Sequence, residues 1–296
     1  MSEFGFINDL RPLADRDHAL DFQDDAATMP PADVICTDTL VESVHFFGSE
    51  PAGELAHKML AVNVSDVLAM NARPTHALLN LSLPRRCDAE WRTDFVAGLK
   101  AACAHFDLRL LGGDTTGAPT SLVLTATVIG ALDGRALWRR SGARVGDRIC
   151  VGGAIGAGAL GLRDMQNGET GSTFAQHFRQ PMPRMDLLDA TGVGGCADVS
   201  DGLIADLIHI CQASNVTGVL DLTHVPYADP SADWAAQVTG GDDYQLVFTL
   251  SPEFPLPTGC TVVGEITQRQ PERSVILDGP AAEIRAAQAN LGYTHF

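Results

Sequence analysis

The chain has 296 residues, of which 45% are hydrophobic and 19% charged, enough apolar material for one large globular domain or two of ordinary size. Its formal net charge of −17 argues against nucleic acid and anionic membrane as partners, because both would repel it. The seven cysteines are scattered and form no C-x-x-C pair, so we expect free thiols in a reducing compartment. No signal peptide or membrane span is evident, which predicts a cytoplasmic protein.

Strand-like and helical patterns alternate along the chain, which predicts a mixed α/β fold. The strand-like runs are residues 32–40, 76–83, 121–132, 148–153, 244–250 and 261–266. The helical patterns are residues 53–71, 88–106, 183–191, 201–214 and 281–290. An arginine- and glycine-rich segment at 137–146 reads as a junction, so we predict one domain over residues 1–140 and a second over residues 141–296.

The first part of the chain places acidic residues beside hydroxyl groups, in FQDDAA (22–27) and in CTDTLVESVHF (36–46). Carboxylate and hydroxyl oxygens are ligands for hard cations. For His45 alone, an ordinary structural or surface role is the commoner alternative.

Asp66 is the most informative single residue, because it lies near the middle of an apolar helical stripe. At 100° per residue, that stripe contains Leu55, Met59, Val62, Ala69 and Met70. A carboxylate that faces a core is costly unless it is paired, hydrogen-bonded or bound to a metal. A metal or phosphate role is favoured over a structural one, in which Asp66 caps a helix or pairs with Arg73.

Three glycine-rich segments also carry aspartates. LLGGDTT (110–116) combines glycines that let a phosphate approach the backbone with a possible metal ligand, although Gly-Gly-Asp is also common in plain turns. In GGCADVSDGL (194–203), Ser200 is alternatively a helix N-cap. GGDDYQL (240–246) leads into a strand. Arg139 and Arg140 could reach a phosphate, or could be two solvated arginines.

Together these segments predict a carboxylate cage for several divalent cations that bridge phosphates. The lysines are Lys58 and Lys100, and neither follows a glycine-rich loop. The P-loop motif G-x-x-x-x-G-K-[ST] is missing from the sequence, which excludes a P-loop enzyme, and the protein-kinase motifs are missing as well.

The ordered set of these motifs resembles the thiamine-monophosphate kinase family, in the superfamily of aminoimidazole ribonucleotide synthetase. The resemblance covers DDAA, TDTLVESVHF, AVNVSDVLAMNARP, LGGDTT, RRSGARVGD, DVSDGL, GGDDYQL and the terminal GYTHF. It implies an N-terminal α/β domain that binds ATP and Mg²⁺ and dimerises through its sheet, with a C-terminal α/β domain beside it. It also implies an ATP-dependent kinase that converts thiamine monophosphate to thiamine diphosphate by direct transfer of the γ-phosphate, with several Mg²⁺ ions as cofactor. The expected partners are therefore ATP, thiamine monophosphate and a second copy of the chain.

By motif position, the resemblance implies roles for particular residues. The metal ligands would be Asp25, Thr37, Asp38, Asp66, Asp114, Asp198 and Asp201. ATP would contact Gly113, Asp114, Arg140 and Ser200. The substrate would contact His45 and Asp242. No general base is expected, because a phosphate monoester, with a second pKa of about 6, is already ionised near neutrality.

The chain departs from the family pattern at Gln23, in place of a glycine, and at Cys36, in place of a serine. Asp242 replaces a glutamate and shortens the reach toward substrate. Asn290 lies where an aromatic ring often stacks, so that Tyr293 or Phe296 would have to substitute.

Alternative functions remain open at this point. Selenophosphate synthetase is expected to carry a reactive cysteine earlier than Cys36, and the hydrogenase-maturation member is expected to end in cysteine rather than YTHF. A non-catalytic acidic cation-binding protein would bind metal without nucleotide, which a nucleotide titration would decide.

Overall fold

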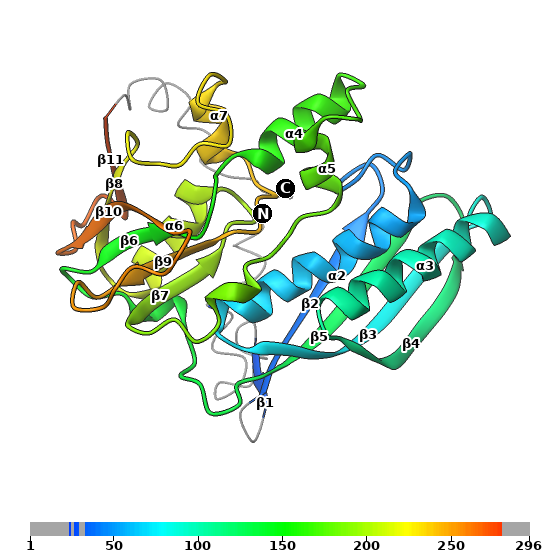
Figure 1. Ribbon diagram of the computed structural model, residues 1–296, viewed down its shortest axis with the longest axis horizontal. Helices are drawn as coiled ribbons and strands as arrows, with labels where there is room; N and C mark the ends of the chain where they lie inside the picture. Colours follow the sequence, from blue (N-terminus) through cyan, green and yellow to red (C-terminus); the bar gives the residue numbers. More distant parts are fainter. Residues whose placement is uncertain (1–23, 25–26, 30–32, 280–296) are drawn as a thin grey trace.

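The computed structural model describes residues 24, 27–29 and 33–279. Within these residues the chain forms two β-sheets, one from each half of the sequence, with helices packed on them (Figure 1). The mixed α/β class predicted from the sequence is confirmed. In the described part of the chain, no helix combines the length and apolar composition needed to cross a bilayer. All seven cysteines are free thiols, as expected.

The first sheet has the strand order β1-β2-β5-β3-β4, in which only the β3–β4 pair is parallel. Its strands are β1 (Ala27–Met29), β2 (Asp33–Val41), β3 (Arg73–Pro84), β4 (Arg109–Ala118) and β5 (Val123–Ala131). The helices α2 (Ala52–Ala69) and α3 (Ala89–His105) lie on one face of this sheet (Figure 1). The alternative that LLGGDTT is a plain turn is wrong, because these residues lie within β4.

The second sheet has the order β11-β8-β10-β6-β9-β7, and its parallel pair is β11–β8. Its strands are β6 (Arg148–Val151), β7 (Val193–Asp198), β8 (Thr217–Asp221), β9 (Leu246–Leu250), β10 (Thr261–Thr267) and β11 (Val275–Asp278). The helices of this half are α4 (Ala157–Gln166), α5 (Thr173–Arg179), α6 (Leu203–Ala213) and α7 (Trp234–Thr239). Short 3₁₀ turns lie at η3 (Arg140–Gly142) and η4 (Met185–Leu187).

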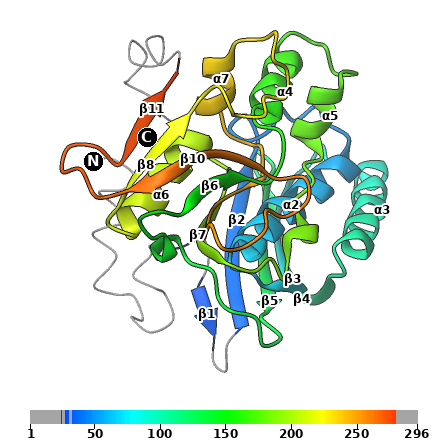
Figure 2. The ribbon, with the colours of Figure 1, turned by 60° about the vertical axis from the view of Figure 1, so that its left-hand side comes forward.

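Helix α2 is apolar almost all round, and such a helix is stable only when it is buried on several sides. It contacts β2, β5 and α3 in its own half and β7 and α5 in the other, and Figure 2 shows it between the two halves. The helix ends where Asn71 adopts a left-handed conformation with φ 60°, a common way to terminate a helix. Helix α3 begins at Asp88, whose side chain accepts the N–H of Trp91 at 2.9 Å. The predicted helices at 53–71, 88–106 and 201–214 are therefore confirmed.

The predicted helix at 183–191 is wrong, because only the η4 turn forms there. Pro181 and Pro183 cannot donate main-chain hydrogen bonds to a helix, and Asp189, with φ 71°, is left-handed. The predicted helix at 281–290 lies outside the described residues.

One apolar cluster joins the two halves. It packs Ala69 of α2 and Trp138 against the buried faces of β6, β7 and β9, through residues such as Cys150, Cys196 and Phe248. Burial of a side chain such as Phe248 contributes about 1.5–3 kcal/mol, so this cluster holds the two halves in a defined relation. The relation matters because the largest group of predicted site residues lies between the halves.

Candidate active site

A cavity of about 710 Å³ lies between the two halves of the chain. Its lining includes eight of the residues predicted from the sequence: Asp38, His45, Asp66, Arg140, Asp198, Ser200, Asp201 and Asp242. They come from segments far apart in the sequence, from β2 to the loop before β9. A volume of this size is typical of small-molecule sites.

Four of the aspartates that line the cavity come from four different elements. Asp38 lies on β2, Asp66 on α2, Asp198 at the end of β7 and Asp201 just before α6. Burial raises the pKa of the Cys36 thiol well above its usual range, and Asp66, Asp38 and Asp198 raise it further. Three carboxylates from both halves therefore act on one buried group, which indicates a concentrated negative field in this part of the cavity.

The Cys36 thiol is not placed to act as a metal ligand. Its thiol is buried and donates to the main-chain carbonyl of Asn63 at 3.2 Å. Asn63, which sequence reasoning missed, also accepts the N–H of Asp38 at 2.9 Å and donates to the carbonyl of Met59 at 3.0 Å. Because Asn63 lies one helical turn before Asp66, these bonds fix the β2 backbone at Asp38 relative to the carboxylate on α2.

The loop that carries Asp201 is held by a buried carboxylate rather than by Ser200. Asp206 is 1% exposed, and its Oδ2 accepts the N–H groups of Asp201 and Gly202, each at 3.1 Å. The alternative role of Ser200 as an N-cap is wrong, because Gly202 occupies that position and Ser200 Oγ instead donates to Asp198 Oδ1 at 3.3 Å. The N–H groups of Asp201 and Gly202 are therefore already hydrogen-bonded within the protein.

A carboxylate–imidazole group extends this loop into α6. Potential ligand atoms of Asp201, Asp206 and His209 lie within 4.8 Å of one another. Burial lowers the pKa of His209 to about 4, with the nearby Arg140 as a second cause, so that the imidazole is neutral near pH 7. Sequence reasoning selected Asp201 alone, although Asp206 and His209 share one helix face at i and i+3.

Arg140 is positioned by its main chain. Asp24 Oδ1 accepts the N–H of Arg140 at 2.7 Å, and Asp24 Oδ2 accepts two hydrogen bonds from the guanidinium of Arg139 at 3.0 and 3.1 Å. The carbonyl of Arg140 accepts the hydroxyl of Ser214 at 2.7 Å. Arg140 lines the cavity, whereas Arg139 is occupied with Asp24. Asp25, the predicted ligand next to Asp24, lies outside the described residues.

His45 and Asp242 also line the cavity. The N–H of Val41 donates to Nδ1 of His45 at 2.9 Å, so the proton of the neutral imidazole is on Nε2. The carboxylate of Asp242 binds the ammonium of Lys58 through Oδ2 at 3.0 Å and the hydroxyl of Tyr244 through Oδ1 at 2.8 Å. Both oxygens of Asp242 therefore already have protein partners.

The loop that carries Asp242 is hydrogen-bonded both to the Ser200 loop and to the start of α4. The N–H of Asp242 donates to the carbonyl of Ser200 at 3.0 Å. The buried carboxylate of Asp243 accepts the N–H groups of Gly156 and Gly158 at 2.6 and 2.9 Å, at the start of α4. The separation between the Asp242 loop and the Ser200 loop is thereby fixed.

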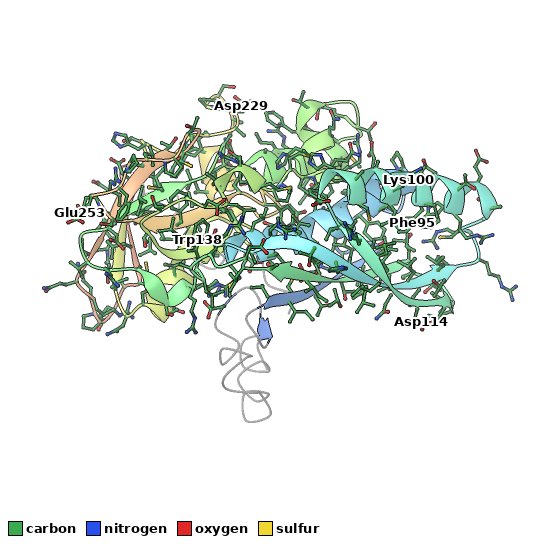
Figure 3. All side chains as sticks on the ribbon, turned by 60° about the horizontal axis from the view of Figure 1, so that its bottom comes forward. Phe95, Lys100, Asp114, Trp138, Asp229 and Glu253 are labelled. Carbon is green, nitrogen blue, oxygen red and sulfur yellow. The ribbon has the colours of Figure 1, made fainter. Side chains whose placement is uncertain are left out.

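Three predicted residues are not brought to this cavity. The hydroxyl of Thr37 lies on the opposite face of the sheet from Asp38, as the alternation of a strand requires, and donates to the carbonyl of Ala126. Gly113 and Asp114 lie on β4, and Figure 3 shows Asp114 far from the second half. Asp38 and Gly113 occupy one row of the sheet, three strand spacings or about 14 Å apart. The roles of Thr37, Gly113 and Asp114 stay predictions.

The glycine at 113 has a local structural reason. Its φ is 146°, and a Cβ there would lie 1.8 Å from the carbonyl oxygen of Leu79 on β3. Any side chain would therefore push β4 away from its neighbour. Gln23, Asn290, Tyr293 and Phe296, the positions of the remaining departures, lie outside the described residues.

Comparisons with known proteins agree with the fold. Residues 23–132 match the family model described as AIR synthase related protein, N-terminal domain. The chain is 40% identical over 265 residues to the thiamine-monophosphate kinase of Caulobacter vibrioides, covering 82% of this chain and 75% of that protein. It is 35% identical over 292 residues to that of Escherichia coli K12, covering 88% and 86%. A solved structure of AaThiL complexed with AMPPCP and TMP superposes with a TM-score of 0.88 at 27% identity, covering 100% of this chain and 97% of the other.

Proposed function

This chain belongs to the thiamine-monophosphate kinase family, and we propose that it transfers the γ-phosphate of ATP directly to thiamine monophosphate in an in-line reaction, with Mg²⁺ ions held by aspartates. ATP as co-substrate and thiamine monophosphate as acceptor follow from its relatives. The observation that carries the rest of the proposal is the convergence of Asp38, Asp66, Asp198 and Asp201 on one cavity from four elements.

The residues fit hard divalent cations by the chemistry of their donors. All four of these side chains offer carboxylate oxygens, the ligands that Mg²⁺ prefers. A cavity this rich in carboxylates would repel ATP and a phosphate monoester, so the anions need an intervening cation. When bound, Mg²⁺ would neutralise negative charge on the phosphates. The aspartates would hold the ions, and the chain's own framework would keep those aspartates in place.

Phosphoryl transfer depends mainly on positioning and charge stabilisation. Arg140 is fixed at its main chain by Asp24 and Ser214 while its side chain lines the cavity, which suits a nucleotide phosphate contact. The N–H groups of Asp201 and Gly202 are directed to Asp206, so phosphate binding by the start of α6 does not rest on these two amides. The acceptor phosphate is ionised near neutrality, and no general base is required.

A homodimer through the outer face of the first sheet would account for the distant Gly113 and Asp114. The outer face carries paired hydroxyls, such as Thr37 with Thr127 at 3.0 Å, and the strand register places Asp114 beside Asn80 on that face. Leu110 and Leu111 of the edge strand β4 are 46% and 57% exposed. Exposed apolar side chains on an edge strand favour contact with another copy. In such a dimer, Asp114 of one chain could approach the cavity of the other.

A stoichiometric assay tests the proposal directly. With ATP and MgCl₂, the purified chain should form one thiamine diphosphate for each ADP, and should show no comparable turnover with thiamine, aminoimidazole precursors or selenide as acceptor. If the transfer is a single in-line step, a chiral γ-thiophosphoryl group should be transferred with inversion of configuration at phosphorus. Release of inorganic phosphate without thiamine diphosphate would contradict the function. Metal binding without nucleotide affinity would favour the non-catalytic alternative.

A further inference from the structure

Lys58 is a buried lysine whose ammonium group has a complete set of partners. It lies on α2, in the first half of the chain, and is 1% exposed. Its Nζ donates to Asp242 Oδ2 at 3.0 Å and to the main-chain carbonyl of His45 at 3.2 Å. The same nitrogen lies 3.6 Å from the centroid of the Phe178 ring, on α5. An ammonium has three N–H donors, and here three acceptors surround it: a carbonyl, a carboxylate and an aromatic face.

This arrangement excludes the role usually expected of a lysine near phosphates. A lysine that binds a phosphate must present at least one N–H to the ligand, and must be reachable from the cavity. The ammonium of Lys58 is enclosed, and its three acceptors come from the protein itself. Lys58 therefore acts on other residues rather than on a bound anion.

The residues that Lys58 contacts line one part of the cavity, here called the Lys58 end. His45 belongs to the first half of the chain, whereas Asp242 and Phe178 belong to the second, and all three line the cavity. Asp242 is 184 residues away from Lys58 in sequence. A single buried charge thus fixes the distance between the two walls at this end, while Tyr244 holds the other oxygen of the Asp242 carboxylate.

We propose that Lys58 is a positioning residue for the binding of thiamine monophosphate, and that it acts by clamping His45 and Asp242 together across the two halves. The proposal rests on the proposed function. It assigns the Lys58 end of the cavity to the thiamine moiety. Loss of these Lys58 contacts should weaken acceptor binding much more than nucleotide binding. The protein segments expected to bind the nucleotide are held by separate contacts to Asp24, Ser214 and Asp206.

Lys58→Met tests this, because methionine preserves the length of the side chain but removes the charge and the donors. We expect KM for thiamine monophosphate to rise about tenfold or more, since small displacements of binding groups have large effects, while KM for ATP changes less than about threefold. Lys100→Met is the matched control: it removes the other lysine, which is exposed on α3 (Figure 3), and should leave both constants unchanged. Isothermal titration with each ligand checks the result independently of turnover.

A double variant separates positioning from stability. Lys58→Met leaves the Asp242 charge without its buried counterion, and Asp242→Asn removes that charge. The double variant should recover melting temperature yet keep the raised KM for thiamine monophosphate. If KM recovers together with stability, or if KM for ATP rises as much as that for the acceptor, the positioning role is wrong. Failure of the wild-type chain to form thiamine diphosphate would instead count against the proposed function.

Tyr244→Phe is a milder variant for the case in which Lys58→Met does not fold. It removes only the hydroxyl that donates to Asp242 Oδ1. We expect a rise of about threefold or more in KM for thiamine monophosphate at unchanged KM for ATP, in line with the loss of one hydrogen bond to a charged group. Unchanged constants in a folded Tyr244→Phe variant would overturn the assignment of this end of the cavity to the acceptor.

Discussion

Gly241 packs directly against the Ser200 loop, and replacing it with alanine should push the two loops of the cavity apart. A Cβ at this position would lie 2.0 Å from the carbonyl oxygen of Ser200 and 3.3 Å from Cα of Asp201. Real Cβ contacts are essentially never shorter than 3.0 Å. Since the obstructing atom belongs to the backbone, no side-chain rotation relieves the overlap. One loop must therefore move by about 1 Å from the other.

The expected cost follows from this displacement. Overpacking of this kind destabilises a protein by about 1–3 kcal/mol. The moving loops carry Asp201, a proposed metal ligand, and Asp242, a proposed acceptor contact, and both residues line the cavity. A misplacement of about 1 Å can reduce reactivity about 100-fold, equivalent to about 2.7 kcal/mol of transition-state stabilisation. The hydrogen bond from the N–H of Asp242 to the Ser200 carbonyl, at 3.0 Å, would be strained as well.

The measurement is kcat/KM with each substrate, beside a thermal melt of the same sample. Gly241→Ala should lower kcat/KM about 100-fold while most of the protein remains folded at the assay temperature. Gly171→Ala is the control, because a Cβ there meets nothing within 4 Å. Wild-type kcat/KM together with an unchanged melting temperature would refute the reasoning, because it would mean that the loops tolerate a wider separation.

Asp66→Asn and Asp201→Asn should each reduce turnover about 100-fold, because the amide keeps the size of the side chain but not the charge that holds a cation; normal turnover in both variants at saturating MgCl₂ would contradict a shared cluster. Arg140→Ala should raise the dissociation constant for ATP about tenfold or more, whereas Arg144→Ala, an exposed arginine in the same segment, should leave it unchanged in a nucleotide titration. Burial lowers the pKa of His57 from 6.5, so the unfolded state takes up a proton more readily than the folded state, and the free energy of unfolding should decrease as pH falls from about 6.5 through the lowered pKa. His57→Gln should make that decrease smaller in urea titrations, and an identical pH dependence would show that burial of the imidazole is not its cause.

Features encoded within a few residues were predictable from the sequence. The apolar pattern of residues 53–71 predicts a buried helix, and the same pattern identifies Asp66 as an unusual carboxylate on it. By contrast, α4 was missed, since Gly158 and Gly161 disfavour a helix locally. Gly158 is needed for close packing against a segment that is distant in the sequence. A Cβ at Gly158 would lie 2.4 Å from the carbonyl oxygen of Gly241.

The partners of the site residues were decided by the tertiary structure alone. Sequence reasoning paired Asp66 with Arg73 as a structural alternative, but Arg73 binds Asp133 at 2.9 Å. Ser200 looked like a helix cap, but Asp206 takes the amides of that loop. The sequence by itself determined which segments carry carboxylates and which are apolar, because these depend on residue type and local period. Which carboxylate meets which cation depends on how the two halves pack, and packing joins residues as far apart as Lys58 and Asp242, a pairing that no local pattern encodes.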